Sequence, residues 1–273
     1  MRIFSSTLKL VLMGLILVPV SAMGGPIEDG KQAFAARNYD DARQSFAKAF
    51  GDGEAEGGYF LARMFELGLG VEVDDLAAVR LYRQTAQSGY AQSLNRLALM
   101  HFRGELGVAQ DFVQARDYFS LAAKAGDKNA QFNLGKLYFE GKGTDKNLDQ
   151  ALALYRQAAA QDHILALNTL GALYKKGAKS PADKEKARQY FQRSAEFGNA
   201  VGLFESGLFQ LEQGDDVANR IAAHRLFNLA AARGHPRALE ALRELTVVMT
   251  SDDLRQAQEE ARAFVALSVS EGK

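Results

Sequence analysis

A period of 36 residues runs through most of this chain of 273 residues. Each period carries a mark, nearly always a glycine, with an aromatic residue seven positions before it and an alanine eleven positions before it. The marks are Gly53, Gly89, Gly126, Asp162, Gly198 and Gly234; the aromatic residues are Phe46, Tyr82, Phe119, Tyr155, Phe191 and Phe227; the alanines are Ala42, Ala78, Ala115, Ala151, Ala187 and Ala223. Internal similarity of this kind indicates units that stack on one another.

Each unit is expected to contain two short helices. In the unit of 126–162, apolar residues at Leu134, Leu137 and Tyr138 mark one face of a helix. Glycines then break that helix, and a second apolar period begins after Asn147, which is a good N-cap residue. A hairpin of two such helices cannot bury its own apolar face, so it needs neighbours on both sides.

Two further slots follow each mark. The slot eight residues after it holds Leu61, Leu97, Leu134, Leu170, Ser206 and Leu242, and the next slot holds Ala62, Ala98, Gly135, Gly171, Gly207 and Arg243. We expect the small residues and the alanines to lie where helices cross closely, and the aromatic ring to fill the wedge between hairpins. The Asn or Asp fifteen residues before each mark is expected to cap the second helix; these residues are Asn38, Asp74, Asp111, Asn147, Asp183 and Asn219.

The unit AQFNLGKLYFEGKG, continued by DQALALYRQAA, resembles the Sel1-like repeat, a relative of the tetratricopeptide repeat. The resemblance implies an all-α fold, a right-handed α-solenoid of stacked helix-turn-helix units. The expected organisation is one solenoid domain over 27–270, with a tetratricopeptide-like hairpin at 27–50, Sel1-like repeats over about 53–248 and a C-terminal capping helix at 251–268. An alternative role for the last helix is that of an amphipathic helix that binds a partner. The family serves as a protein-interaction scaffold in many settings, so the resemblance specifies the fold more closely than the function.

The first residues have the pattern of a signal peptide. Arg2 and Lys9 provide a basic start, residues 10–18 form an apolar run too short to span a bilayer comfortably, and small residues precede the bond after Ala22. We predict a signal peptide over 1–22, cleaved after Ala22, and a periplasmic or secreted protein. The alternative is an uncleaved membrane anchor. No cysteine follows the apolar run, so a lipid-anchored cysteine is excluded, and no disulfide supports the fold.

Charge and motifs exclude several function classes. The chain has 33 basic and 33 acidic residues, whereas a protein that seeks phosphates normally carries a basic excess. Three of the four histidines occupy repeat positions, and no spacing of histidine, cysteine or carboxylate indicates a metal site. The glycine pairs follow helices, so they are turn glycines rather than phosphate loops, and no nucleophile motif is present. We therefore predict no catalytic residues, no metal, no cofactor and no nucleic-acid partner.

The remaining candidate is the surface of the solenoid. By analogy with tetratricopeptide proteins, slots ten and thirteen after each mark should line the concave face. Six of these residues form the predicted partner-binding site: Arg63, Leu99, Phe102, Lys136, Phe139 and Lys175. Aromatic and basic side chains of this kind suit a peptide or an extended segment of a partner. The alternative is that the phenylalanines pack between adjacent first helices.

Three functions follow from these features. The first is an exported scaffold in the bacterial cell envelope that binds another protein on its concave face. The second is a factor that binds the cell wall or an exopolysaccharide or supports its assembly, although the chain has no tryptophan, the commonest sugar-stacking residue. The third is a hydrolase directed at the cell wall or at β-lactams, as has been proposed for some exported relatives. No serine nucleophile motif or metal-ligand set in this sequence supports it. We predict that the protein is not an enzyme.

Overall fold

The computed structural model describes residues 24–177 and 183–268. Within these residues the chain forms α-helices and no strand, which confirms the all-α solenoid. The helices are α1 (Pro26–Ala35), α2 (Tyr39–Gly51), α3 (Ala55–Leu67), α4 (Asp75–Gln87), α5 (Ala91–Arg103), α6 (Phe112–Lys124), α7 (Lys128–Glu140), α8 (Leu148–Ala160), α9 (Ile164–Lys176), α10 (Lys184–Glu196), α11 (Ala200–Gln213), α12 (Val217–Ala232), α13 (Ala238–Thr246) and α14 (Ser251–Arg262). The predicted signal peptide at 1–22 lies outside the described residues, and none of the described helices has the length and apolarity needed to cross a membrane.

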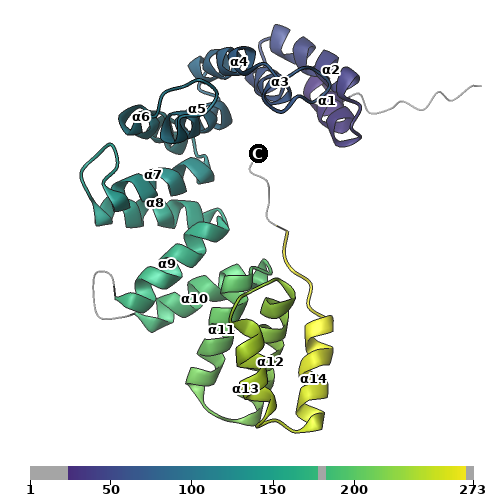
Figure 1. The fold of residues 1–273 in the computed structure, drawn as a ribbon, viewed down its shortest axis with the longest axis vertical. Coiled ribbons are helices and arrows are strands. Elements are labelled where there is room, and N and C mark those ends of the chain that lie inside the picture. Colours follow the sequence, from purple (N-terminus) through teal and green to yellow (C-terminus); the bar gives the residue numbers. More distant parts are fainter. Residues whose placement is uncertain (1–23, 178–182, 269–273) are drawn as a thin grey trace, which may run out of the picture.

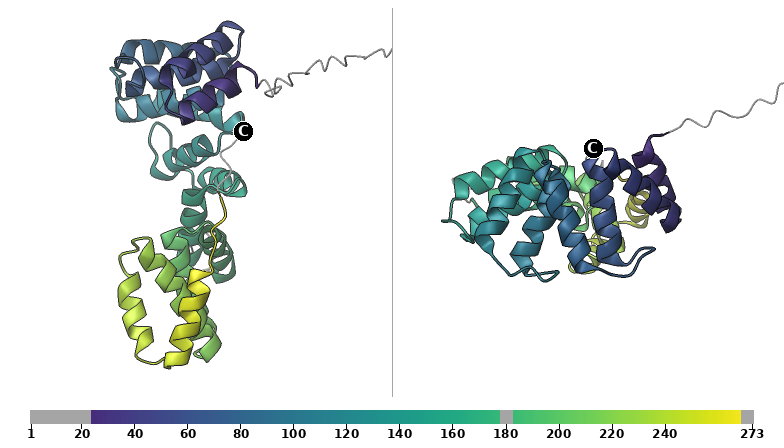
Figure 2. Two further views of the ribbon diagram at one scale, coloured as in Figure 1. Left: turned by 90° about the vertical axis from the view of Figure 1, so that its right-hand side faces the viewer. Right: turned by 90° about the horizontal axis from the view of Figure 1, so that it is seen from above.

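Successive helices pair as hairpins, and each hairpin packs against the next along the chain. The hairpins follow one another around an arc from α1 to α14 (Figure 1). Seen from the side, the N-terminal helices lie at one end and α11 to α14 at the other, so the array coils as it advances (Figure 2). The buried apolar residues of 24–177 and 183–268 form several clusters rather than one core, and each hairpin buries its apolar face against its neighbours, as a solenoid requires.

The small-residue slot lies where the two helices of a hairpin cross. A Cβ atom built on Gly135 would come within 2.8 Å of the Tyr155 ring, and one built on Gly207 within 2.5 Å of the Phe227 ring. The aromatic slot also reaches the next hairpin, as expected, because the ring of Phe46 stacks on Phe60 with centroids 4.6 Å apart. The repeated residues are therefore the contact residues of one recurring packing scheme.

Most second helices begin at the predicted cap. Asp74 accepts the Ala77 N–H at 2.8 Å, and the corresponding residues of α6, α8 and α10 accept in the same way. Asn38 occupies the cap position of α2, but its side chain accepts no backbone N–H of the helix and instead donates to the Asp41 carboxylate at 2.6 Å. The prediction for Asn219 is wrong, because Asp216 caps α12 and accepts the Asn219 N–H at 2.8 Å. Asp216 offers the cap three residues earlier, so the helix begins earlier.

The C-terminal helix is shorter than expected. We predicted a helix over 251–268, whereas α14 ends at Arg262. Its start is fixed by a capping box between Thr250 and Asp253. Residues 263–268 leave the helix and run along the inner side of the arc (Figure 1). There the Leu267 N–H donates to the Glu196 carbonyl at 2.8 Å, a bond that a continued helix could not make.

The helix α14 packs against α12 and forms no hairpin with α13. Ala257 and Ala261 are buried in the same apolar cluster as Phe227 and Leu245. This placement puts α14 over the last complete hairpin of the array, consistent with a capping role.

Candidate functional site

The structure brings together two of the six predicted site residues. The Phe102 ring packs edge-to-face on the Phe112 ring with centroids 5.5 Å apart, and Lys136 Nζ lies 6.0 Å from the Phe102 centroid. Lys142 Nζ lies 5.6 Å from the centroids of both rings. Ammonium groups over aromatic faces are attracted by the ring quadrupole, so these four side chains form a cation–aromatic cluster. Sequence reasoning missed Phe112 and Lys142, which belong to neither slot.

Phe139 follows on the same helix as Lys136 and is 44% exposed. Phe102, in contrast, is half-buried against the apolar cluster that contains Leu134. Phe102 is therefore packed against neighbouring helices, whereas Phe139 is exposed to solvent. Glu140 stands next to Phe139 and pairs with Lys142 at 2.8 Å, which balances part of the cluster's positive charge.

Lys175 makes contacts that join two hairpins. Its Nζ lies 2.7 Å from a Glu205 carboxylate oxygen and 5.7 Å from the centroid of the Phe209 ring. The pair connects the first helix α9 to the first helix α11. Lys175 therefore has a packing role, and it does not share contacts with the cation–aromatic cluster.

The other two predicted residues lie nearer to the N-terminal end. Leu99 is half-buried against the same apolar cluster as Phe102. Arg63 lies beside Tyr59, whose ring also contacts Tyr82 and Tyr90 with centroids 5.9 and 5.4 Å away. Burial raises the pKa of Tyr59, and the positive charge of Arg63 partly opposes this shift. The six predicted residues thus do not converge on one site.

A charged network that sequence reasoning missed links α3 to α5. Arg96 donates from Nε to Glu66 at 3.0 Å and from Nη1 to Glu105 at 2.8 Å. Tyr82 donates its hydroxyl to Glu66 at 2.6 Å, and burial raises the pKa of Tyr82 well above its usual range. Glu66 occupies the same repeat slot as Phe102, so the slot alone does not reveal this partly buried ion pair.

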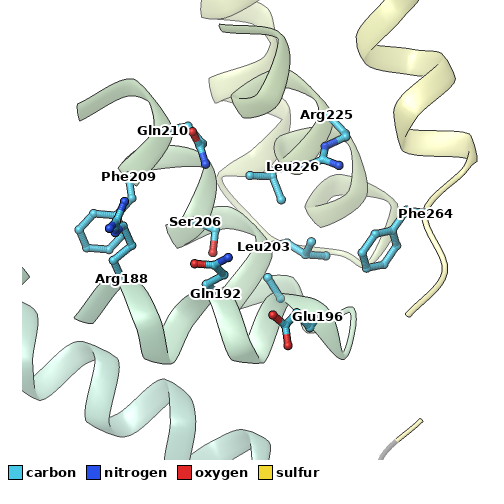
Figure 3. Close-up of a pocket in the computed structure, with 11 residues that line it drawn as sticks. Arg188, Gln192, Glu196, Leu203, Ser206, Phe209, Gln210, Arg225, Leu226 and Phe264 are labelled. Carbon is cyan, nitrogen blue, oxygen red and sulfur yellow. The ribbon is translucent and has the colours of Figure 1, made fainter. Parts of the chain in front are cut away.

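A cavity of about 190 Å³ lies between α10, α11, α12 and the segment of 263–268 (Figure 3). Ser206 and Gln192 face its centre, and Phe209 and Phe264 stand on opposite sides. The remaining lining residues are Arg188, Ala195, Glu196, Leu203, Gln210, Arg225 and Leu226. Its polar groups come from three consecutive helices, and a distant segment adds the ring of Phe264, so no single sequence motif contains the lining residues.

The histidines have structural roles. His163 caps α9, since its Nδ1 accepts the Ala166 N–H at 3.2 Å, and its ring stacks on Phe132. His235 stacks on Phe204 with centroids 4.0 Å apart. Burial lowers the pKa of all four histidines. In the described part of the chain, no group of three or more histidine and acidic side chains is arranged to hold a metal ion.

A family model described as Sel1 repeat matches residues 55–90, 91–127, 128–163, 164–199 and 203–235. The first four matches begin where the helical hairpins begin, and the last begins three residues inside α11. Together they contain the cation–aromatic cluster as well as the charged network.

Known proteins resemble the chain over much of its length. A crystal structure of a Sel1 repeat protein from Oxalobacter formigenes superposes with a TM-score of 0.72 at 25% identity, covering 87% of this chain and 99% of that one. An uncharacterized protein of Neisseria meningitidis serogroup B is 29% identical over 71% of this chain and 42% of its own length. An exopolysaccharide production negative regulator of Rhizobium meliloti is 30% identical over 52% of this chain and 58% of its own. The chain thus spans about half the length of these two relatives.

Proposed function

Because the chain belongs to the Sel1 repeat family, we propose that it is a non-catalytic scaffold that binds another protein in the bacterial cell envelope. A stack of hairpins offers a long, continuous surface, and repeat proteins use such surfaces to bind partners. The predicted signal peptide at 1–22, with cleavage after Ala22, supports export to the periplasm or beyond.

The observation that carries this proposal is Phe139. The Phe139 side chain is 44% exposed, so it leaves apolar surface in water. Phe139 lies three residues after Lys136 on α7, which makes the two side chains neighbours on the helix surface and puts Phe139 next to one member of the cation–aromatic cluster. Aromatic side chains next to cations are typical anchors of protein interfaces. The partner segment that we propose for this patch is an extended peptide with an apolar or aromatic side chain and an acidic neighbour, because two lysines face one glutamate there.

A photo-crosslinking residue at position 139 of the full-length protein, expressed in its bacterial host, tests the proposal. We expect a discrete adduct with one envelope protein. The matched control is position 121 on α6, where Leu121 is 51% exposed but has no cation–aromatic cluster beside it. Equal adducts from both positions, or none from position 139, would contradict the proposal. The intact mass of the same purified protein reports whether the chain begins after Ala22.

A second candidate function is a role in exopolysaccharide or cell-wall assembly. It is supported by the printed name of the Rhizobium meliloti relative, an exopolysaccharide production negative regulator. In the first candidate the scaffold binds another protein. In this second candidate it binds the polysaccharide or the cell wall, or it binds a protein that assembles one of them.

A further inference from the structure

We propose that the cavity between α10, α11, α12 and the segment of 263–268 binds one neutral sugar ring. The cavity shares no residue with the cation–aromatic cluster or with Phe139, so this inference stands apart from the proposed protein-binding surface. It would give the scaffold a second ligand of a different chemical class.

The cavity lies where the chain departs from its own repeat. Five of the six copies place leucine in the slot eight residues after the mark, and the remaining copy places Ser206 there. Ser206 is 8% exposed, and its Oγ has no hydrogen-bond partner. A buried hydroxyl without a partner is unfavourable, because it has lost its hydrogen bonds to water and gained none in the protein. The substitution therefore removes apolar packing and leaves a polar group that a ligand can satisfy.

A second lining group is also unsatisfied. The Nε atom of Arg225 is buried without a hydrogen-bond partner, and the nearest acidic oxygen, on Glu260, lies 3.8 Å away. The Arg225 N–H can only donate a hydrogen bond, whereas the Ser206 hydroxyl can donate or accept one. Both are satisfied by a ligand whose groups can donate as well as accept. Sugar hydroxyls have this property.

The charges around the cavity are already paired. Arg188 Nη2 lies 2.7 Å from Glu185, and Glu196 lies 2.7 Å from Arg193. Arg225 forms a longer ion pair with Glu260 at 3.8 Å, so its charge is balanced although its Nε–H makes no hydrogen bond. The cavity thus offers no uncompensated cation of the kind that would select a carboxylate or a phosphate. A neutral ligand is favoured because it leaves these pairs intact.

The shape and walls suit one ring. Phe209 and Phe264 flank the cavity while Gln192 and Gln210 add amide donors and acceptors (Figure 3). Aromatic side chains provide apolar contact, and a small number of polar groups fixes orientation, as in small-molecule sites generally. The cavity volume is about 190 Å³. That space accommodates one small ring and is below the range of about 300–1,000 Å³ typical of sites for drug-sized ligands.

Saturation-transfer NMR on the full chain tests the inference, with D-glucose, D-galactose and N-acetyl-D-glucosamine as separate probes. We expect at least one of them to give saturation transfer with wild-type protein and to bind at least tenfold more weakly to Ser206→Leu. This variant restores the residue that the other repeats carry, so its helical content and melting temperature should be kept. Phe264→Ala removes one wall and should also weaken binding, whereas Ser88→Leu, at an exposed serine on α4's C-cap, should not.

Three results would overturn the inference. The first is no saturation transfer with any of the three sugars. The second is binding that Ser206→Leu leaves unchanged, which would place the sugar elsewhere on the surface. The third is binding of N-acetyl-L-glutamine instead of the sugars, lost in Ser206→Leu, which would assign the cavity to a peptide side chain. Since none of these variants touches position 139, the crosslinking result stays independent.

Discussion

At the scale of single residues, His163 shows how a cap can depend on protonation. Its Nδ1 must carry a lone pair to accept the Ala166 N–H, so only the neutral imidazole caps α9. Burial, assisted by the charge of Lys128, lowers the pKa of His163 to about 4. The unfolded chain therefore takes up this proton at about pH 6.5, before the folded protein does.

We predict that the protein loses stability as the pH falls from about 6.5 toward 4, and that His163→Asn loses less over this range. Asparagine keeps the cap without titrating, as Asn199 does at the start of α11. The measurement is the free energy of unfolding from urea curves at about pH 7 and about pH 5. The other histidines retain some pH dependence in the variant, so identical slopes in the two proteins would contradict the role of His163.

Much of the packing at this scale could be predicted from the sequence, but little of the candidate site. Ala151 and Leu134 lie buried where the repeat pattern expects them. The departure at Ser206 is equally visible in the sequence, yet its meaning depends on Phe264, which reaches the cavity from a distant segment. The exposure of Phe139 likewise depends on the curvature of the array, and periodicity does not report curvature.

At the scale of helices, the close crossings limit the size of two recurring residues. Gly135 and Ala151 lie where α7 meets α8, with the Tyr155 ring against the glycine. A leucine at either position would overpack this contact, because close-packed interiors leave no room for added methylenes.

We predict that Gly135→Leu and Ala151→Leu each lower the free energy of unfolding by about 1–3 kcal/mol or more. Chemical denaturation followed by circular dichroism measures the loss. Leu76→Ala is the control, since Leu76 is 78% exposed and its replacement should change stability by less than about 0.5 kcal/mol. A leucine variant as stable as wild type would show that the crossing is looser than its geometry indicates.

Helix positions could be predicted well because the apolar period recurs in every unit and glycine turns recur in most of them. The two errors both concern helix ends. Asp216, not Asn219, is the N-cap of α12. The chain leaves α14 at Arg262, before the apolar pattern ends, and Leu267 then donates a hydrogen bond to Glu196 of α10. Ends depend on local competition for hydrogen bonds, which a repeating pattern does not describe.

At the scale of the whole molecule, stability is distributed along the array, because each hairpin packs mainly on its neighbours. Damage at one end should therefore remain near that end. The buried Ala257 on α14 offers a test, since an aspartate there would bury a charge against α12.

We predict that Ala257→Asp raises amide hydrogen exchange in α14 and α12 and leaves α3 to α6 protected as in wild type. Hydrogen-exchange mass spectrometry resolves the helices. The control is Gln258→Asp, which adds the same charge at an exposed neighbouring position. A uniform rise over the whole chain would instead show that the array unfolds as one cooperative unit.

The position of α14 on α12 also bears on how such a protein can change its length during evolution. A duplicated 36-residue unit inserted between two hairpins would find on each side the same small residues, rings and alanines that join the existing units. A unit appended after α14 would find no such surface, because α14 makes no hairpin and already covers α12. Duplications should therefore be retained inside the array, so that descendants differ in the number of hairpins that precede a constant terminal helix.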